Sequence, residues 1–312
     1  MIRSHIQNAN VLVVGDAMLD VYISANRSKP IPSETTDCSA LIQDRQTITL
    51  GGAANVAANV SSLGASVTLA TVTGDDHESK RMCDLCGAHN IDIVVFRDKH
   101  RETTTKTRIV AGGVYVARID KENAHTIPVV LQDMLLSAVL PRIHAFDAVV
   151  FSDYDKGCIT DAVAQEVISE CRNRGVHTVV DAKPHTLDKY NGANTVILNA
   201  QEARALAGYA TATPCVELYK RCGCDTAAVT LSHRGLQYYQ GTTVEHIAGH
   251  RVDNQCAVGC GDTMRAAVAA SVGAGYPTRD ALVIGNAAAA VAVCHNGTAR
   301  VRPEQVDAVL CV

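Results

Sequence analysis

The sequence predicts an α/β fold: a mostly parallel central sheet flanked by helices, with a small β-sheet lid beside it. Short runs of β-branched residues alternate with longer helical patterns, and such alternation is typical of βαβ units. The strand candidates are apolar on both faces, as the strands of a buried parallel sheet are. Two extended stretches interrupt the pattern and supply the separate sheet.

The expected strands follow one another at Val11–Val14, Val67–Val72, Ile93–Phe96, Ala148–Ser152, Thr178–Asp181, Thr195–Asn199 and Ala227–Leu231. Helical stretches lie between and after them, at Ala53–Leu63, His77–Cys86, Leu131–Ile143, Asp161–Arg174, Gln201–Ala207, Thr263–Val272 and Arg279–Cys294. The extended stretches Tyr22–Leu50 and Thr104–Asp120 are expected to pair into a small antiparallel lid. Because parallel sheets bind ligands beyond the carboxyl ends of their strands, informative residues should follow the strands.

The composition excludes several classes of protein. The 312-residue chain is 47% hydrophobic and 19% charged, which is enough apolar material for a sizeable core. Its formal net charge of -4 argues against a nucleic-acid partner. No signal peptide is visible, and the longest uncharged stretch, Ala281–Thr298, contains Asn286 and His295 and fits a buried helix better than a membrane span. We therefore expect a cytoplasmic protein without a membrane partner.

The twelve cysteines are scattered along the chain and are interpreted as free thiols that act as small hydrophobic residues. Two pairs are close in sequence, Cys83 with Cys86 and Cys222 with Cys224. A zinc site needs four ligands at supporting spacings, and neither pair has them. The cysteine pattern therefore gives no reason to expect a metal or redox centre.

The sharpest motif is Gly259-Cys260-Gly261-Asp262-Thr263, which opens an Ala-rich helix. Glycines let successive backbone N–H groups point outward, and the helix N-terminus adds positive partial charge, so this segment suits an anion. A carboxylate in the same turn makes sense if it removes a proton from a hydroxyl that attacks a phosphate. The helix dipole would keep Asp262 ionised at neutral pH. The alternative is a glycine-rich turn in which Asp262 only caps the helix.

Two further motifs follow the same logic. A glycine pair, Gly51 and Gly52, opens a helix on which Asn55 and Asn59 share one face, so backbone N–H groups and an amide could hold sugar hydroxyls. The alternative is a helix start with Asn55 packed against the sheet. After the first strand, Asp16 and Asp20 could accept hydrogen bonds from several hydroxyls of a polyol, and the alternative there is a solvated loop.

With these motifs the chain resembles the ribokinase (PfkB-type) carbohydrate kinase family over nearly its whole length. The shared elements are Gly15-Asp16, Asp20, Gly51-Gly52-Ala53-Ala54-Asn55, Asn199-Ala200-Gln201-Glu202 and Gly259-Cys260-Gly261-Asp262. Finer features resemble the D-glycero-D-manno-heptose 7-phosphate kinases: Ser152-Asp153-Tyr154-Asp155-Lys156-Gly157, Asp181-Ala182-Lys183-Pro184, Thr105-Lys106-Thr107-Arg108, Arg118-Ile119-Asp120 and Gly297-Thr298. Bifunctional members of that group continue into a nucleotidyltransferase domain, and the resemblance covers the kinase half alone. It implies one ribokinase-like domain over residues 1–312.

The resemblance implies transfer of the ATP γ-phosphoryl group to the anomeric hydroxyl of a heptose 7-phosphate, with Mg²⁺. Asp262 would be the base, and Gly259, Cys260 and Gly261 would form the anion hole. The nucleotide would contact Asn199, Glu202, Thr230, Ser232, Gly235, Gly285, Asn286 and Ala290, with Glu202 reaching Mg²⁺ through water. The sugar would contact Asp16, Asp20, Gly51, Gly52 and Asn55.

A substrate that already carries a phosphate needs cations for its far end, and the candidates are Arg108, Arg118, Lys156 and Lys183. For the two arginines the alternative is an ordinary solvated charge on the lid. The wider alternatives are a kinase of another sugar or nucleoside, which needs none of these cations, and a non-catalytic sugar- or nucleotide-binding regulator. The exposed lid strands would leave unpaired edges, so we also expect a homodimer through the lid.

The chain departs from the family pattern just before the anion hole, within it and at Ser232. The family has Asp-x-Thr before the anion hole, whereas this chain has Cys256-Ala257-Val258, with Asp253 three residues earlier. The Thr hydroxyl is missing, which bears on nucleotide or ion contacts at that point. Cys260 replaces the usual Ala in the anion hole, which is a small change in volume. Ser232 stands where Gly is common.

Overall fold

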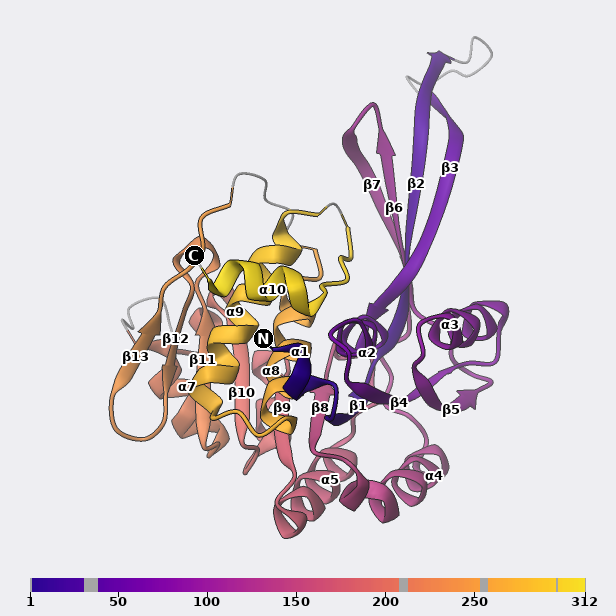
Figure 1. Cartoon of the computed structure of the whole chain (residues 1–312). Helices are drawn as coiled ribbons and strands as arrows, with labels where there is room; N and C mark the ends of the chain where they lie inside the picture. Colours follow the sequence, from indigo (N-terminus) through magenta and orange to yellow (C-terminus); the bar gives the residue numbers. More distant parts are fainter. Residues whose placement is uncertain (1, 31–38, 208–212, 253–257, 296, 312) are drawn as a thin grey trace.

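The computed structural model describes residues 2–30, 39–207, 213–252, 258–295 and 297–311. It consists of a large sheet covered by helices on both faces and a smaller sheet that projects from it (Figure 1). The family motif at Asp253, Cys256 and Ala257 falls outside the described residues. Within the described part, no helix is both long and apolar enough to span a membrane.

The large sheet has the strand order β13-β12-β11-β10-β9-β8-β1-β4-β5. Its strands are β1 (Asn10–Gly15), β4 (Ser66–Gly74), β5 (Asp92–Asp98), β8 (Ala148–Ser152), β9 (His177–Asp181), β10 (Thr195–Asn199), β11 (Thr226–Thr230), β12 (Leu236–Tyr239) and β13 (Val244–Ile247). All neighbours pair in parallel except β11 with β12 and β12 with β13. The predicted mostly parallel sheet is confirmed, and the antiparallel hairpin at its edge was not predicted.

The helices are α1 (Arg3–Ile6), α2 (Ala53–Ser62), α3 (His77–Ala88), α4 (Val129–Val139), α5 (Asp161–Arg174), α6 (Ala200–Ala207), α7 (Pro214–Cys222), α8 (Cys260–Gly273), α9 (Thr278–Val293) and α10 (Pro303–Leu310). Every helix expected from the sequence is present with its ends shifted by a few residues. The predicted helix Leu131–Ile143 divides into α4 and a 3₁₀ segment at Leu140–Ala145. Helices α1, α7 and α10 were not predicted.

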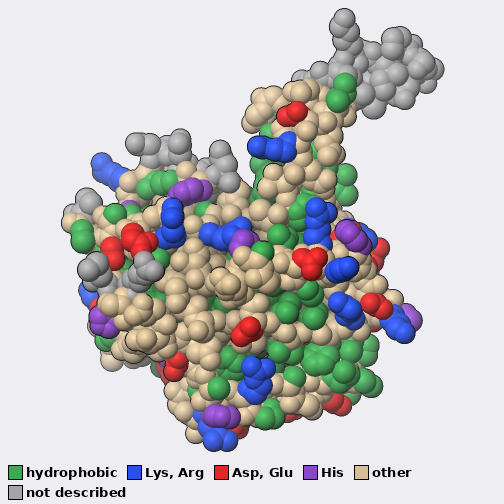
Figure 2. All heavy atoms as spheres, turned by 45° about the vertical axis from the view of Figure 1, so that its right-hand side comes forward, with side chains coloured by type: hydrophobic (Ala, Val, Ile, Leu, Met, Phe, Trp, Pro, Cys, Tyr) green, Lys and Arg blue, Asp and Glu red, His purple; other side chains and the backbone are tan. Residues whose placement is uncertain are grey.

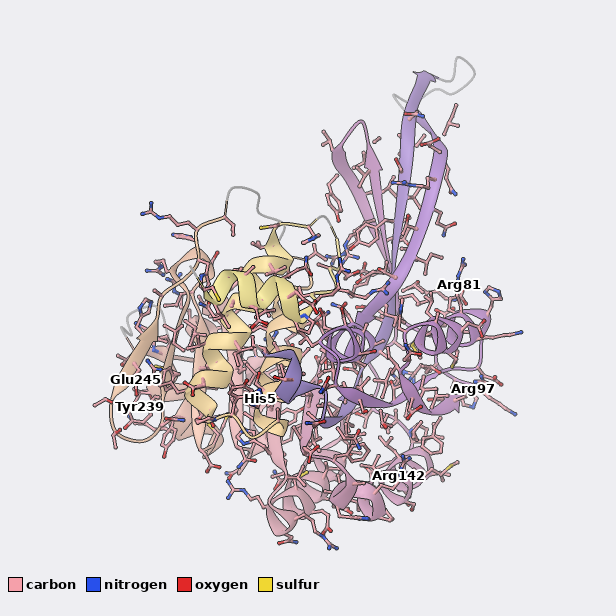
Figure 3. The ribbon with its side chains drawn as sticks, in the orientation of Figure 1. His5, Arg81, Arg97, Arg142, Tyr239 and Glu245 are labelled. Carbon is pink, nitrogen blue, oxygen red and sulfur yellow. The ribbon has the colours of Figure 1, made fainter. Side chains whose placement is uncertain are left out.

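Alternation along the central strands divides the core into two layers. Val11 and Val13 of β1 face the layer of α2, α8 and α9, whereas Leu12 and Val14 face the layer of α4, α5 and α7. All four side chains are buried, which explains why the strand is apolar on both faces. Charged side chains such as Arg81 on α3 and Arg142 after α4 are exposed at the periphery (Figure 3).

The small sheet has the order β3-β2-β6-β7, built from β2 (Ala17–Pro30), β3 (Ser39–Gly52), β6 (Thr105–Ala111) and β7 (Val114–Lys121). The predicted lid is therefore present, with two corrections. It is mixed rather than antiparallel, because β2 and β6 pair in parallel. Its first strand begins at Ala17 rather than Tyr22, so Asp20 lies within a strand and not in a loop.

Candidate active site

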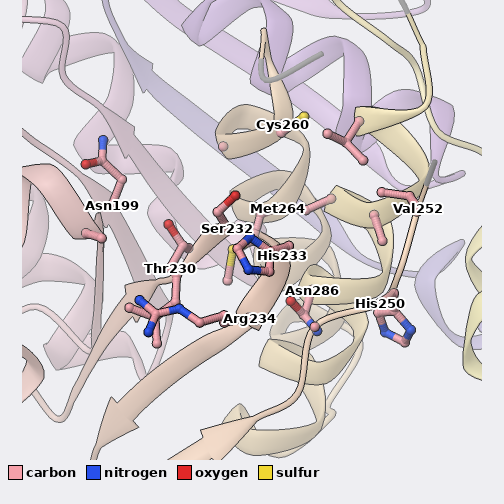
Figure 4. Close-up of a pocket in the computed structure, with 18 of the residues that line it drawn as sticks. Asn199, Thr230, Ser232, His233, Arg234, His250, Val252, Cys260, Met264 and Asn286 are labelled. Carbon is pink, nitrogen blue, oxygen red and sulfur yellow. The ribbon is translucent and has the colours of Figure 1, made fainter. Parts of the chain in front are cut away.

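A cavity of about 650 Å³ lies beyond the carboxyl ends of β10 and β11 and is bounded by α8 and α9 (Figure 4). This volume is typical of a site for a small ligand or cofactor. The residues expected at the nucleotide or its phosphates that line it are Asn199, Thr230, Ser232, Gly235, Cys260, Gly261, Asn286 and Ala290. Segments far apart in the sequence thus meet at the edge where a parallel sheet binds ligands.

The N-terminus of α8 opens onto this cavity. Gly259 immediately precedes the helix with a φ of 76°, a left-handed conformation that glycine adopts at no steric cost. No side chain of the described residues caps the helix, so the alternative interpretation of Asp262 as a cap is wrong. Cys260 and Gly261, in the first turn, line the cavity. The first turn therefore has the form of an anion site, because its backbone N–H groups lie at the positive end of the helix dipole.

Asp262 is held by two hydrogen bonds from different parts of the chain. The hydroxyl of Tyr154 donates to its Oδ1 at 2.5 Å, and Nδ2 of Asn55 donates to its Oδ2 at 2.8 Å. The side chain is buried, and burial raises its pKa, while the bonds from Tyr154 and Asn55 oppose that rise. Burial and Asp262 also raise the pKa of Tyr154, which therefore keeps its proton and remains a donor. The result is a positioned carboxylate with more basic character than one in water.

Asn55 belongs to a buried polar ladder between α2 and α8. Asn59 donates from Nδ2 to the backbone oxygen of Asn55 at 3.0 Å, and Thr263 donates from Oγ1 to Oδ1 of Asn59 at 3.2 Å. The ladder fixes the amide of Asn55 toward Asp262. Asn55 was expected to hold sugar hydroxyls, and the structure shows that its amide also holds the carboxylate.

Asp16 organises the loop that carries Tyr154. Its carboxylate accepts hydrogen bonds from the backbone N–H groups of Tyr154 at 2.9 Å, Lys156 at 3.0 Å and Cys158 at 3.1 Å. Burial, and then the charge of Asp153, raise its pKa to about 6. Asp16 was expected to bind sugar hydroxyls. In the structure both of its oxygens accept hydrogen bonds from the loop, and its role toward sugar hydroxyls stays a prediction.

The base of the lid gathers the other residues expected at the sugar. Asp20 of β2 is buried and forms an ion pair with Nη1 of Arg108 on β6, so the alternative of a solvated loop is wrong there. A Cβ on Gly51 would lie 2.7 Å from Oδ2 of Asp20, which shows how closely β3 approaches that carboxylate. Gly52, with a φ of 55°, directly precedes α2 and its Asn55. The base of the lid therefore lies near Asp262. The charge of Asp20 raises the pKa of Asp262.

Each of the three remaining cation candidates pairs with a carboxylate. Nζ of Lys156 lies 2.8 Å from Oε1 of Glu122, a carboxylate that also pairs with Lys106. Nζ of Lys183 lies 2.8 Å from Oε1 of Glu202 and 5.5 Å from the ring centre of Tyr154.

Arg118 differs from the other candidates because its side chain is 57% exposed and pairs with Asp120 on the same strand. For Arg118 the alternative of a solvated lid charge describes the structure better than a role in substrate binding.

Asn199 and Glu202 form a reciprocal capping box where β10 leads into α6. Oδ1 of Asn199 accepts from the N–H of Glu202 at 2.9 Å, and Oε2 of Glu202 accepts from the N–H of Asn199 at 3.1 Å. This spacing fixes the Glu202 carboxylate at the sheet edge, near Asp181. The described residues contain no cluster of three or more metal-ligating side chains.

A family model described as pfkB family carbohydrate kinase matches residues 8–305. The chain belongs to this family. It is 31% identical over 320 residues to the bifunctional protein HldE of Trichlorobacter lovleyi, covering 99% of this chain and 65% of the relative. It is 34% identical over 306 residues to that of Gluconobacter oxydans, covering 95% and 63%. The chain thus spans less than two thirds of the length of these curated relatives.

Solved structures of similar fold confirm the ribokinase-like architecture of this PfkB kinase. Phosphofructokinase-2 from Escherichia coli in complex with substrates and products has a TM-score of 0.78 at 17% identity, covering 97% of this chain and 98% of that one. A carbohydrate kinase from Agrobacterium tumefaciens has a TM-score of 0.75 at 21% identity, covering 97% of both chains. Family membership makes the protein a phosphotransferase that acts on a sugar hydroxyl.

Packing and backbone conformation set apart two of the residues expected at the nucleotide, Gly285 and Ser232. A Cβ on Gly285 would lie 2.6 Å from Cγ2 of Val268, so this glycine allows close packing of α9 on α8. Its expected place at the adenine stays a prediction. Ser232 has a φ of 58°, which explains why glycine suits that position.

The sequence interpretation missed several lining residues of the kinase site, including His250 and Arg265. It also missed Tyr154 as a partner of Asp262. For Arg265 a signal was available, because a residue three positions after Asp262 returns to the same side of the helix.

Proposed function

We propose that this PfkB kinase transfers the γ-phosphoryl group of ATP to the anomeric hydroxyl of D-glycero-D-manno-heptose 7-phosphate, giving the 1,7-bisphosphate. The observation that carries the proposal is a buried carboxylate, Asp262, in the first turn of an uncapped helix that opens onto a cavity. A carboxylate there repels a bound phosphate, so a protein that only binds nucleotide gains nothing from it. This argues against a non-catalytic regulator.

The chemistry follows from the positions of these groups. Asp262 accepts the proton of the anomeric hydroxyl while that oxygen forms a bond to the γ-phosphorus and the bond to the ADP oxygen breaks. The N–H groups of Cys260, Gly261 and Asp262 stabilise the charge on the transferring group. Mg²⁺, held through the Glu202 carboxylate, would neutralise phosphate charge when bound. ATP and Mg²⁺ are proposals that follow from the family and the form of the site.

The far phosphate of the substrate would bind to a pair of lysines at the base of the lid. Lys106 and Lys156 share the carboxylate of Glu122 at 3.2 and 2.8 Å, and the side chain of each lysine is 17% exposed. A phosphate carries enough charge to replace that carboxylate between the two ammonium groups. Lys156 lies two residues from Tyr154, so this site is joined to the loop that holds Asp262. The resemblance to heptose 7-phosphate kinases, and relatives named bifunctional protein HldE, support the same substrate class.

A panel of sugar phosphates tested with ATP and Mg²⁺ checks the substrate. We expect kcat/KM for the heptose 7-phosphate to exceed that for the unphosphorylated heptose by about 100-fold, since charge-assisted bonds contribute about 1.5–3 kcal/mol each. Phosphorus NMR should place the new phosphate on the anomeric carbon. Equal rates with and without the 7-phosphate would point instead to a neutral sugar or a nucleoside as substrate.

A pair of variants links this preference to the lysines. Lys156→Gln should reduce the preference for the phosphorylated sugar about 10-fold, which corresponds to about 1.4 kcal/mol. Arg174→Gln removes an equally positive but exposed side chain on α5 and should leave the preference unchanged. A preference that survives in Lys156→Gln would remove this residue from the phosphate site.

We also propose a homodimer through the lid strands. The lid exposes large apolar side chains, among them Ile42, Val114, Tyr115 and Ile119. Hydrophobic side chains are visible on the surface of the projecting sheet in Figure 2. Such exposure is typical of surfaces that pair with another molecule. A monomeric mass in solution would contradict the dimer.

The cytoplasmic location expected from the sequence also stays a prediction.

A further inference from the structure

Arg265 is an unusual residue to find inside the cavity. It lies on α8, three residues after Asp262, and only 6% of the residue is exposed. It nevertheless lines the cavity together with Cys260 and Gly261. A guanidinium is almost never buried without anionic partners, so its bonding groups have to be accounted for.

The partners present leave part of the guanidinium unused. Nη2 lies 2.7 Å from Oδ1 of Asp181 and donates to the backbone oxygen of Ile197 at 3.3 Å. Nε is buried and has no hydrogen-bond partner among the described residues. A buried donor of a charged group that stays unpaired costs free energy, which a ligand with acceptor oxygens would remove.

The position of the guanidinium relative to the anion hole is set by Gly261. A Cβ on Gly261 would overlap Nη1 of Arg265, so the guanidinium lies directly against the backbone at that residue. That backbone supplies one of the N–H groups expected to hold the transferring phosphoryl group. The cation and the helix N-terminus therefore face the same part of the cavity.

The competing explanation for the buried Arg265 is that it only forms a structural ion pair with Asp181. Burial raises the pKa of Asp181 to about 7, although the charge of Arg265 lowers it. The charge of Asp181 favours the charged form of Arg265, but the pair occupies Nη2 and leaves Nε without a partner among the described residues. Asp262 and Glu202 add negative charge nearby, and each favours the charged form of Arg265.

We propose that Arg265 is a catalytic residue whose guanidinium binds the γ-phosphoryl oxygens during transfer. This rests on the proposed position of the nucleotide in the cavity. Arg265 forms no covalent bond; it donates hydrogen bonds to the phosphoryl oxygens while the bond to ADP breaks and the bond to the sugar oxygen forms. The planar guanidinium is suited to such oxygens, and an arginine supplied within one chain is a known way to stabilise this charge.

Two calorimetric titrations without a sugar test the proposal. One uses MgADP, and the other uses the magnesium complex of AMP-PNP, a nucleotide that carries the γ-phosphoryl group that ADP lacks. In Arg265→Gln we expect the affinity for AMP-PNP to fall about 10- to 100-fold, which corresponds to the loss of a charged hydrogen bond. The affinity for ADP should fall less than about 3-fold. With the heptose 7-phosphate, kcat should fall about 10³-fold. Equal effects on both nucleotides would overturn the proposal.

The double variant Arg265→Gln/Asp181→Asn separates catalysis from folding, because it removes both charges of the buried pair. We expect it to fold and to keep the defects toward AMP-PNP and in kcat. Recovery of both to within about 3-fold of wild type would show that the pair is only structural. If the wild type binds neither nucleotide, the proposed nucleotide position and this proposal fail together. If it binds both but does not phosphorylate the heptose 7-phosphate, only the substrate assignment fails, and the comparison of nucleotides still decides on Arg265.

Discussion

Asp262→Asn should lower kcat about 10³- to 10⁴-fold, because general base catalysis contributes factors of about 10²–10⁴ and the carboxylate is the only base placed at the helix N-terminus in the described structure. Asparagine has nearly the same shape as aspartate and keeps one side-chain oxygen. One of the two donors, Asn55 or Tyr154, therefore retains its acceptor. The affinity for MgADP should therefore change less than about 3-fold. Steady-state kinetics together with calorimetry check both parts.

Tyr154→Phe is the matched control, because it leaves the carboxylate and removes one bond to it. That bond lowers the pKa of Asp262, so its loss raises the pKa further. The base must be ionised to act, and the rate falls as pH falls through its pKa. We therefore expect the acidic limb of the pH profile of kcat/KM to move to higher pH, with the plateau lowered less than about 10-fold. An Asp262→Asn variant that turns over normally would remove Asp262 from its role.

Gly15→Ala should destabilise the fold by about 3 kcal/mol, the upper part of the range for overpacked interiors. Gly15 ends β1 and pairs with Ser152 at the end of β8. A Cβ on Gly15 would overlap the backbone oxygen of Ser152, and backbone atoms cannot rotate away as a side chain can. The two central strands would have to separate just before Asp16. Denaturant unfolding of the purified variant measures the loss.

The matched control for Gly15→Ala is the same substitution in an open position. Gly87 lies in α3 and has no atom within 4 Å of the position that a Cβ would take. Alanine there should stabilise the protein by about 0.5 kcal/mol, because it favours the helix. If the two variants lose equal stability, the close contact of β1 with β8 is not the cause.

The strands and long helices could be predicted because their patterns are local. The run Val11–Val14 is apolar on both faces because each face packs on a different layer of helices. Helix α7 was missed although Pro214 stands at its start and Gly223, in a left-handed conformation, follows its end. These signals were present, but the helix is short and its apolar spacing alone is weak.

The site was predicted only in part, because contacts between distant segments leave no local pattern. The glycines around Asp262 and the turn at Asn199 and Glu202 indicated their own local structure. Nothing in the sequence indicated that Tyr154 would donate to Asp262. A buried cation such as Arg265 is also hard to predict, because arginine is mostly exposed and its counter-charge, Asp181, comes from strand β9 rather than from its own helix.

The two donors that hold Asp262 lie 108 and 207 residues away along the chain. Closing loops of such length costs conformational entropy, which the assembled sheet and helices must offset. Turnover is consequently a property of the intact domain, and no contiguous fragment of it contains both donors without containing nearly everything between. An assay of catalytic rate therefore doubles as a sensitive gauge of how many molecules in a sample have completed folding.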